Sequence, residues 1–114
     1  MQKPADYMEE IRGCAIINQD ERDELLSSQI MAWCKSYYQL VACMAVFKAY
    51  HEPIDRKSIC NMFNSEMNTM LRRASKFRDY LSIECYTCVC ASIHELKDDS
   101  QYAVMKQLEK EDII

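Results

Sequence analysis

The chain has one glycine and two prolines in 114 residues, and this shortage limits the folds it can adopt. Sheets and catalytic loops need many tight turns, and tight turns depend on glycine, proline and asparagine. The sequence therefore predicts an all-α domain of long helices with short connections. Loops that cradle phosphates are excluded, because they need glycines that let the backbone approach the ligand. At this length we expect residues 1–114 to form a single domain.

Apolar residues recur at helical spacing along most of the chain and predict a series of helices. The expected helical segments are residues 6–17, 20–35, 36–50, 56–63, 65–81, 82–96 and 102–108. The pattern leaves open whether the second and third segments form one helix through Ser36. It also leaves a strand as the alternative for the sixth segment, because its threonine, valine and cysteines have middling helix propensity. The predicted fold is an all-α, compact bundle of five to seven helices around a central buried helix.

The central helix is expected around residues 38–50, where apolar residues occupy nearly every side. Its wide apolar face consists of Tyr37, Leu40, Val41, Met44, Phe47 and Tyr50. A helix that is apolar nearly all round is packed by neighbours on several sides. Pro53 is expected to end it, because the residue before a proline is pushed out of the helical region. Asp55 then fits the N-cap of the next helix.

Two polar segments downstream are expected to interrupt the helices. Asn64 and Ser65 read as a tight turn, with Ser65 capping the helix that follows. Residues 97–100 read as a solvated break before the last short helix. With these two interruptions, the expected number of helices is five to seven.

The formal net charge is −4, but the charges are unevenly distributed. Residues 1–53 carry five Lys/Arg against eight Asp/Glu, residues 54–81 six against three, and residues 82–114 three against seven. The basic residues of the middle segment are Arg56, Lys57, Arg72, Arg73, Lys76 and Arg78. Their order of helix, short turn and helix is similar to a helix-turn-helix, which makes them candidates for binding DNA or an acidic protein partner. The alternative is the solvated face of an ordinary helix, since a DNA-binding domain is usually basic overall.

The seven cysteines are predicted to be reduced thiols, most of them in the core. Their odd number and the absence of a signal-peptide pattern at the N-terminus argue against a disulfide framework. We therefore expect an intracellular protein, nuclear or cytoplasmic, with no membrane span.

The most ligand-like cluster consists of Cys85, Cys88, Cys90 and His94. On a helix, the first two share one face and the last two share roughly the opposite face, so one helix cannot close a four-ligand zinc site. A metal would require this stretch to be a loop, and we expect none.

Catalytic constellations are also missing from the pattern. His51 and His94 are the two histidines, and neither has a neighbouring thiol and orienting group that would make a nucleophile. No pair of carboxylates stands out as an acid/base couple. We expect a protein that is not an enzyme and carries no cofactor.

Residues 40–81 resemble the cyclin-box helices of general transcription factor IIB and of the sixth subunit of the origin recognition complex. The resemblance lies in a small-residue central helix, a proline corner, a short helix and a longer final helix. The matching residues are Ala42, Cys43, Met44, Phe47 and Ala49, the corner Pro53-Ile54-Asp55-Arg56, then Ile59 and Cys60, and finally residues 67–81. The resemblance implies a helical docking module in transcription or DNA replication, with a protein partner and with DNA as a second candidate.

The alternative is a helical protein–protein adaptor without a nucleic-acid role. The chain is rich in tyrosine and methionine, with seven and eight residues respectively. Such residues make adaptable interfaces. A hydrophobic groove would then bind a protein partner or a second copy of the chain, and a small viral or host-modulating bundle is one form of such a protein.

Overall fold

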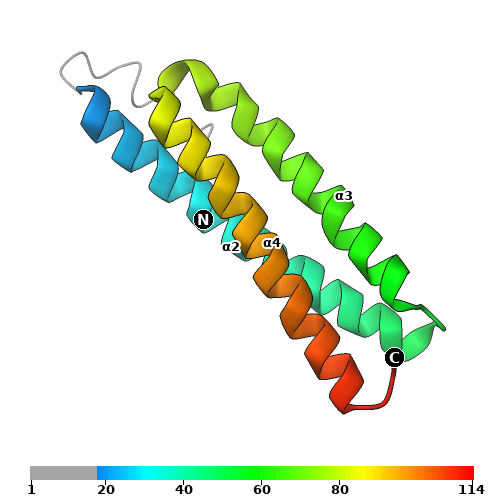
Figure 1. Cartoon of the computed structure of the whole chain (residues 1–114). Helices are drawn as coiled ribbons and strands as arrows, with labels where there is room; N and C mark the ends of the chain where they lie inside the picture. The colour runs from blue at the N-terminus through cyan, green and yellow to red at the C-terminus, as the bar shows by residue number, and fades with distance from the viewer. Residues whose placement is uncertain (1–17) are drawn as a thin grey trace.

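The computed structural model describes residues 18–114 as an elongated three-helix bundle (Figure 1). Its elements are α2 (Gln19–His51), α3 (Arg56–Ala74), the 3₁₀ helix η1 (Ser75–Tyr80) and α4 (Ile83–Lys110). The chain runs down α2 in Figure 1, back up along α3 and down again along α4, which contacts both other helices. The bundle measures 55 × 24 × 19 Å. The helix predicted for residues 6–17 lies outside the described residues.

The all-helical prediction is confirmed for the described residues, but the compact bundle of five to seven helices is wrong. The described part of the chain has three α-helices. Two expected interruptions are absent, because α3 runs through Asn64 and Ser65 and α4 through residues 97–100. Of the two alternatives left open at Ser36, the structure has the single helix, since α2 is continuous there. Fewer and longer helices give a rod rather than a compact cluster, and no helix of residues 18–114 is surrounded by the others on several sides.

The continuity of α3 follows from its buried residues. Ile59, Phe63, Met70 and Ala74 are buried, and Met70 follows Phe63 by seven positions, which is about two helical turns. Asn64 and Ser65 are exposed on the other side of the helix. These residue types cost only a fraction of a kcal/mol in a helix interior, far less than glycine or proline. Burial on one continuous face outweighs that cost.

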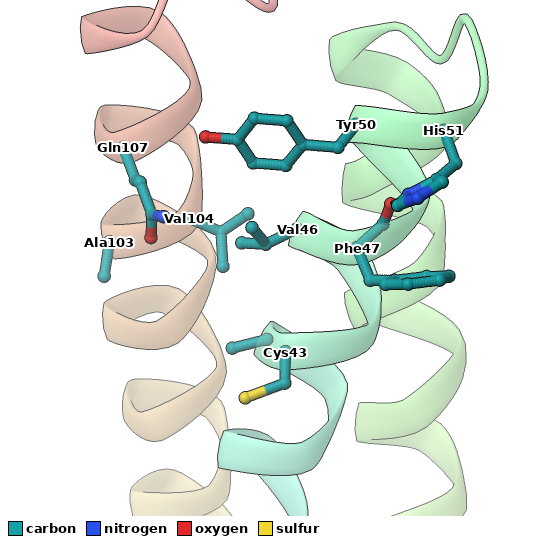
Figure 2. A pocket seen from close by; sticks show the side chains of 9 residues that line it. Cys43, Val46, Phe47, Tyr50, His51, Ala103, Val104 and Gln107 are labelled. Atoms are coloured by element: carbon teal, nitrogen blue, oxygen red, sulfur yellow. The ribbon is translucent and has the colours of Figure 1, made fainter.

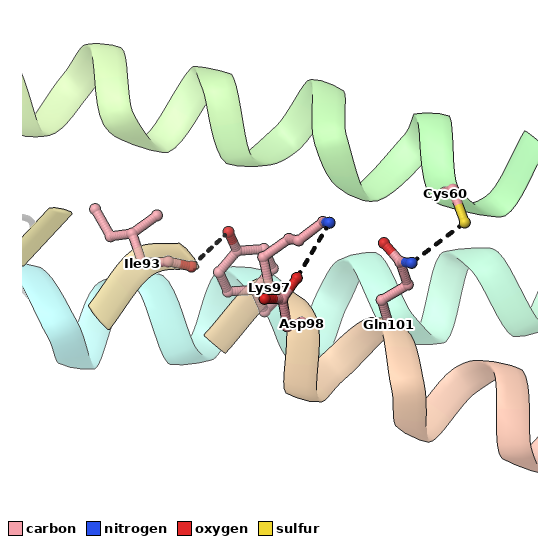
Figure 3. A network of polar contacts seen from close by, with 6 residues as sticks. Cys60, Ile93, Lys97, Asp98 and Gln101 are labelled. Carbon is pink, nitrogen blue, oxygen red and sulfur yellow. Dashed lines mark hydrogen bonds and ion pairs between the residues drawn. The ribbon is translucent and has the colours of Figure 1, made fainter. Parts of the chain in front are cut away.

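The polar stretch of α4 is helical and partly packed against its neighbours (Figure 3). Gln101 donates from Nε2 to the Cys60 sulfur on α3 at 3.2 Å. The Lys97 side chain is only 13% exposed, and its ammonium lies 3.3 Å from an Asp98 oxygen. Long cationic side chains can bury their stems while the charge reaches a polar partner. The segment predicted as a solvated break is therefore a half-buried, polar part of the helix, and the strand alternative for residues 82–96 is wrong.

Side-chain caps fix the start of each α-helix. Asn18 caps α2 and Asp55 caps α3, each carboxyl or amide oxygen accepting a backbone N–H bond of 2.8 Å. Ser82 caps α4 in the same way, over 3.2 Å. The predicted cap at Asp55 is confirmed. Glu52, directly before Pro53, has extended backbone angles and ends α2 as predicted.

One continuous core runs the length of the bundle. Its members are Leu26, Ile30, Cys34, Tyr38, Val41, Ala45, Ala49, Ile59, Phe63, Met70, Ala74, Phe77, Leu81, Val89, Ile93, Val104 and Leu108. Tyr38 is almost fully buried, and its hydroxyl donates to the Ile93 carbonyl at 3.2 Å. This bond satisfies the polar end of the largest buried side chain and ties α2 to α4.

Asp23 fastens the start of α4 to α2. Its carboxylate accepts the Ser82 backbone N–H at 2.9 Å and also the Ser82 hydroxyl. Gln19 donates a further bond of 2.6 Å. Burial raises the pKa of the Asp23 carboxyl, but these hydrogen bonds and the charge of Arg22 outweigh burial and hold the pKa below its ordinary value. Since Ser82 is also the N-cap of α4, one carboxylate positions the helix start.

Ser65→Ala tests the continuity of α3, because the sign of the change in unfolding free energy differs between a helix interior and an N-cap. In a helix interior, alanine should raise the free energy of unfolding by up to about 0.5 kcal/mol, because alanine has the higher propensity. At an N-cap, the same change would lower it by about 1 kcal/mol. Urea unfolding distinguishes the two, and destabilisation would contradict the continuous helix.

Asp23→Asn should lower the free energy of unfolding by about 1 kcal/mol at neutral pH, because a charge-assisted bond to Ser82 is weakened. The lowered pKa means that the contribution is present above about pH 4 and is lost as pH falls through the folded-state value. The difference in unfolding free energy between wild type and Asp23→Asn should therefore shrink as the pH is lowered below about 4.

The matched control for this measurement is Glu24→Gln, since Glu24 is the exposed neighbouring carboxylate. It should change stability by no more than about 0.5 kcal/mol. A gap for Asp23→Asn that stays constant as the pH falls would contradict the account.

Candidate interaction surface

The second half of α2 presents large apolar side chains to solvent. They follow one another at intervals of three and four residues, so they share one face of the helix. This α2 stripe consists of Leu40 (56% exposed), Met44 (55%), Phe47 (65%) and Tyr50 (52%). Scattered apolar residues are normal on a surface, whereas a contiguous row of four makes this face a candidate interaction surface.

The stripe corrects the expectation of a helix packed on several sides. The buried residues on this half of α2 are Val41, Ala45 and Ala49, and they face α3 and α4. The large residues between them point outward instead. The helix is apolar on nearly every side, but within residues 18–114 it is covered by α3 and α4 alone.

A shallow groove lies beside the stripe, between α2 and α4 (Figure 2). Its volume is about 530 Å³. It is lined by Ala42, Cys43, Val46, Phe47, Tyr50, His51, Ala103, Val104 and Gln107. The Tyr50 ring extends from α2 toward α4 across one end, while Val46 and Val104 face each other along the middle. Small, aliphatic and aromatic residues thus form most of the lining, and Gln107 is its polar side chain on α4.

A second hollow of about 500 Å³ lies along α2, lined in part by Met44, Lys48 and Glu52. Phe47 borders both hollows and separates them as a ridge. Its ring stacks on His51, with centroids 4.1 Å apart and planes inclined by 23°. The His51 Nδ1 lies 2.8 Å from the Phe47 carbonyl oxygen. The stacking and this contact hold the ridge in one orientation.

By length and composition, α2 is also the one helix of residues 18–114 that is apolar enough to cross a membrane. Only 28% of its most apolar window is buried in the bundle. One such helix is weak support for a membrane span, because the core helix of a soluble bundle passes the same test. The low buried fraction is nevertheless a second measure of how much apolar surface α2 leaves uncovered.

The six basic residues predicted to bind DNA or an acidic partner do not form one face. Arg56 and Lys57 lie at the start of α3, and Arg72 and Arg73 at its end, about 24 Å away along the axis. The turn that would have made a helix-turn-helix is absent, because α3 is continuous. The sequence-based motif is therefore wrong, although the residues are exposed.

Several of these cations have partners within the bundle. Arg56 pairs with Glu109 on α4. The Arg73 guanidinium lies 5.1 Å from the ring of Trp33, and that of Arg78 lies 5.7 Å from the ring of Tyr86. These contacts hold three of the six side chains against the protein. Lys57, Arg72 and Lys76 are exposed and belong to opposite ends of the α3–η1 segment.

The cysteine–histidine cluster lies on α4, as a helix rather than a loop. Cys85 is half-buried and donates to the Asp23 carbonyl at 3.7 Å, while Cys88 and His94 are exposed. Among residues 18–114, no three His, Cys, Asp or Glu side chains converge as metal ligands would. The expectation that most cysteines are core thiols is wrong for the described residues, because Cys34 alone of the six is fully buried.

Burial makes the core titratable groups less reactive. It raises the pKa of the Cys34 thiol to about 12, so the nucleophilic thiolate is not populated near neutral pH. Burial also raises the pKa of the Tyr38 hydroxyl, and nearby Cys34, Asp98 and Glu66 raise it further. Both groups therefore act as neutral packing residues.

No family model, curated protein or solved structure matches this chain. The resemblance to the cyclin box thus stays a prediction, and the continuous α3 replaces the short and long helices on which part of it depended. The exposed apolar surface of α2, in contrast, is observed in the structure and does not depend on that resemblance.

Phe47→Ala and Phe63→Ala form a matched pair that tests this surface. Phe47 is mostly exposed and Phe63 is fully buried. The first change should cost no more than about 0.5 kcal/mol of unfolding free energy, and the second about 3–5 kcal/mol. Urea unfolding at low protein concentration checks this, since dilution keeps association from adding to the result. Equal costs would show that Phe47 belongs to the core.

Proposed function

We propose that this chain is a non-enzymatic helical docking domain that binds a protein through the α2 stripe and the groove beside it. The observation that carries the proposal is the row of four large apolar side chains, each more than half exposed, on the second half of α2, the longest of the described helices. Leaving them in water is unfavourable by roughly 25 cal/mol per Å² of apolar surface. A bound partner would remove this cost.

The shape of the face suits an amphipathic helix as the bound segment. Such a helix inserts side chains at positions i, i+3, i+4 and i+7 into an apolar groove. The groove between α2 and α4 runs along α2 from Ala42 to His51, which is about two and a half helical turns. Its small lining residues, Ala42 and Ala103, leave room for a backbone to approach closely.

A protein partner accounts for this surface better than DNA does. Duplex DNA is held mainly by cations placed along phosphates. The basic residues lie on α3 and η1, in two groups, and three of them already contact Glu109, Trp33 and Tyr86. Beside the α2 stripe, Lys48 lines the second hollow and lies 4.0 Å from Glu52.

Binding also accounts for the chemistry of the described side chains better than catalysis does. Enzymes bring groups with shifted pKa values together in a cleft. Here the strongest shifts belong to Cys34 and Tyr38, which lie in the core and are raised toward their neutral forms. The open groove is lined by aliphatic and aromatic residues instead.

Site-specific photocrosslinking in cells tests the proposal. Benzoylphenylalanine at position 47 should give a discrete covalent adduct with one protein, because a docked chain would lie against that ring. The matched control places the same group at Asn64, which is exposed on the outer side of α3. The same adducts at both positions, or none at position 47, would overturn the docking role.

A further inference from the structure

We propose that the occupant of this face is a second copy of the chain, with the two α2 helices packed antiparallel around a two-fold axis near Cys43 and Met44. The inference rests on the proposed docking function and names its partner. It also assigns the bound amphipathic helix, which is the α2 of the other copy.

The spacing of the stripe is self-complementary. In a two-fold interface, if residue i contacts residue j of the other copy, then j contacts i. Leu40 and Phe47 lie at equal distances on either side of the point between Cys43 and Met44. An antiparallel pair centred there places each Leu40 opposite the other copy's Phe47, and each Cys43 opposite the other Met44.

The relief of the face supports the same arrangement. Phe47 is the ridge between the two hollows of this face, and the groove between α2 and α4 lies beside it. Helices pack when the ridge of one enters the groove of another. Because one face carries both features side by side, two copies can exchange ridges and grooves without any rearrangement of the bundle.

The available area fits a dimer of moderate stability. An aromatic side chain carries roughly 150–250 Å² of surface, so Phe47 and Tyr50 each expose on the order of 100–150 Å². With Leu40, Met44 and the groove lining, one copy offers roughly 600 Å². Stable interfaces bury about 800 Å² per partner, which places this dimer near the lower end of that class. We therefore expect dissociation on the order of micromolar.

The charges around the face favour an uncharged partner surface. Lys48 and Glu52 are four residues apart on one edge and offset each other, and Gln107 lies on the α4 side. An anionic membrane would require a cationic rim, and a net charge of −4 opposes that attraction. A neutral face meets a second neutral face without unpaired charge.

Analytical ultracentrifugation of the full chain over a broad concentration range tests the dimer. Wild type should pass from monomer to dimer with rising concentration. Phe47→Asp should weaken association by at least about 100-fold, because two carboxylates would be buried against apolar surface. Ile83→Asp is the matched control: Ile83 is 84% exposed at the far end of the bundle, and this change should leave association unaltered. A wild type that stays monomeric, or equal effects of the two variants, overturns the proposal.

Crosslinking of mixed isotope-labelled chains identifies the occupant directly. Benzoylphenylalanine at position 47 in a mixture of ¹⁴N and ¹⁵N chains should give light–heavy adducts to residues of α2 or α4. Links within one chain to residues 1–17 would overturn the dimer and show that the chain covers itself. If the purified protein stays monomeric while position 47 captures a different protein in cells, the second-copy inference fails and the docking role stands. Absence of adducts in both settings removes both.

Discussion

The packing of one face of α2 against α3 and α4 is the contact on which the rest of the structure depends. Seven residues of α2 are buried, from Leu26 to Ala49. They meet Phe63 and Met70 from α3, and Ile93 and Leu108 from α4, in one continuous core. Because α3 and α4 both occupy this single side of α2, the opposite side has no neighbour among the described residues. The uncovered apolar face is thus a direct consequence of how the core is built.

The choice of buried side is governed by residue size. Along the second half of α2, the buried positions are Val41, Ala45 and Ala49, while Met44 and Phe47 are exposed. Small side chains let helix axes approach closely, and close approach gains dispersion contacts along the whole helix. Burying the large residues instead would have held the helices apart and left voids beside the alanines. The fold therefore leaves some apolar surface of α2 exposed while its small residues pack closely against the neighbouring helices. The large residues remain available to a partner.

Sequence reasoning succeeded where a local rule decides the structure. The shortage of glycine and proline predicts helices, Pro53 ends α2, and Asp55 caps α3. It failed where a local signal competes with packing over a longer range. Asn64 and Ser65 resemble a turn, yet Phe63 and Met70 stay in phase across them. The same holds on α4, where Ile93 and Val104 are three turns apart across the polar segment. Checking whether the apolar residues on both sides of a polar segment share one helix face would have found both continuous helices.

The α2 stripe was harder to predict, because a sequence does not show how many helices are available to cover an apolar one. The row of small residues does indicate which side is packed.

The central claim is that the exposed side of α2 is a binding surface. Methyl NMR of methionine-labelled protein tests it most directly, because Met44 lies on the stripe and Met70 is fully buried in the same bundle. The account predicts that the Met44 methyl resonance shifts or broadens as the protein concentration rises, while the Met70 resonance stays in place. A Met44 resonance that is unchanged at every concentration, and also on addition of any protein captured at position 47, would contradict the account.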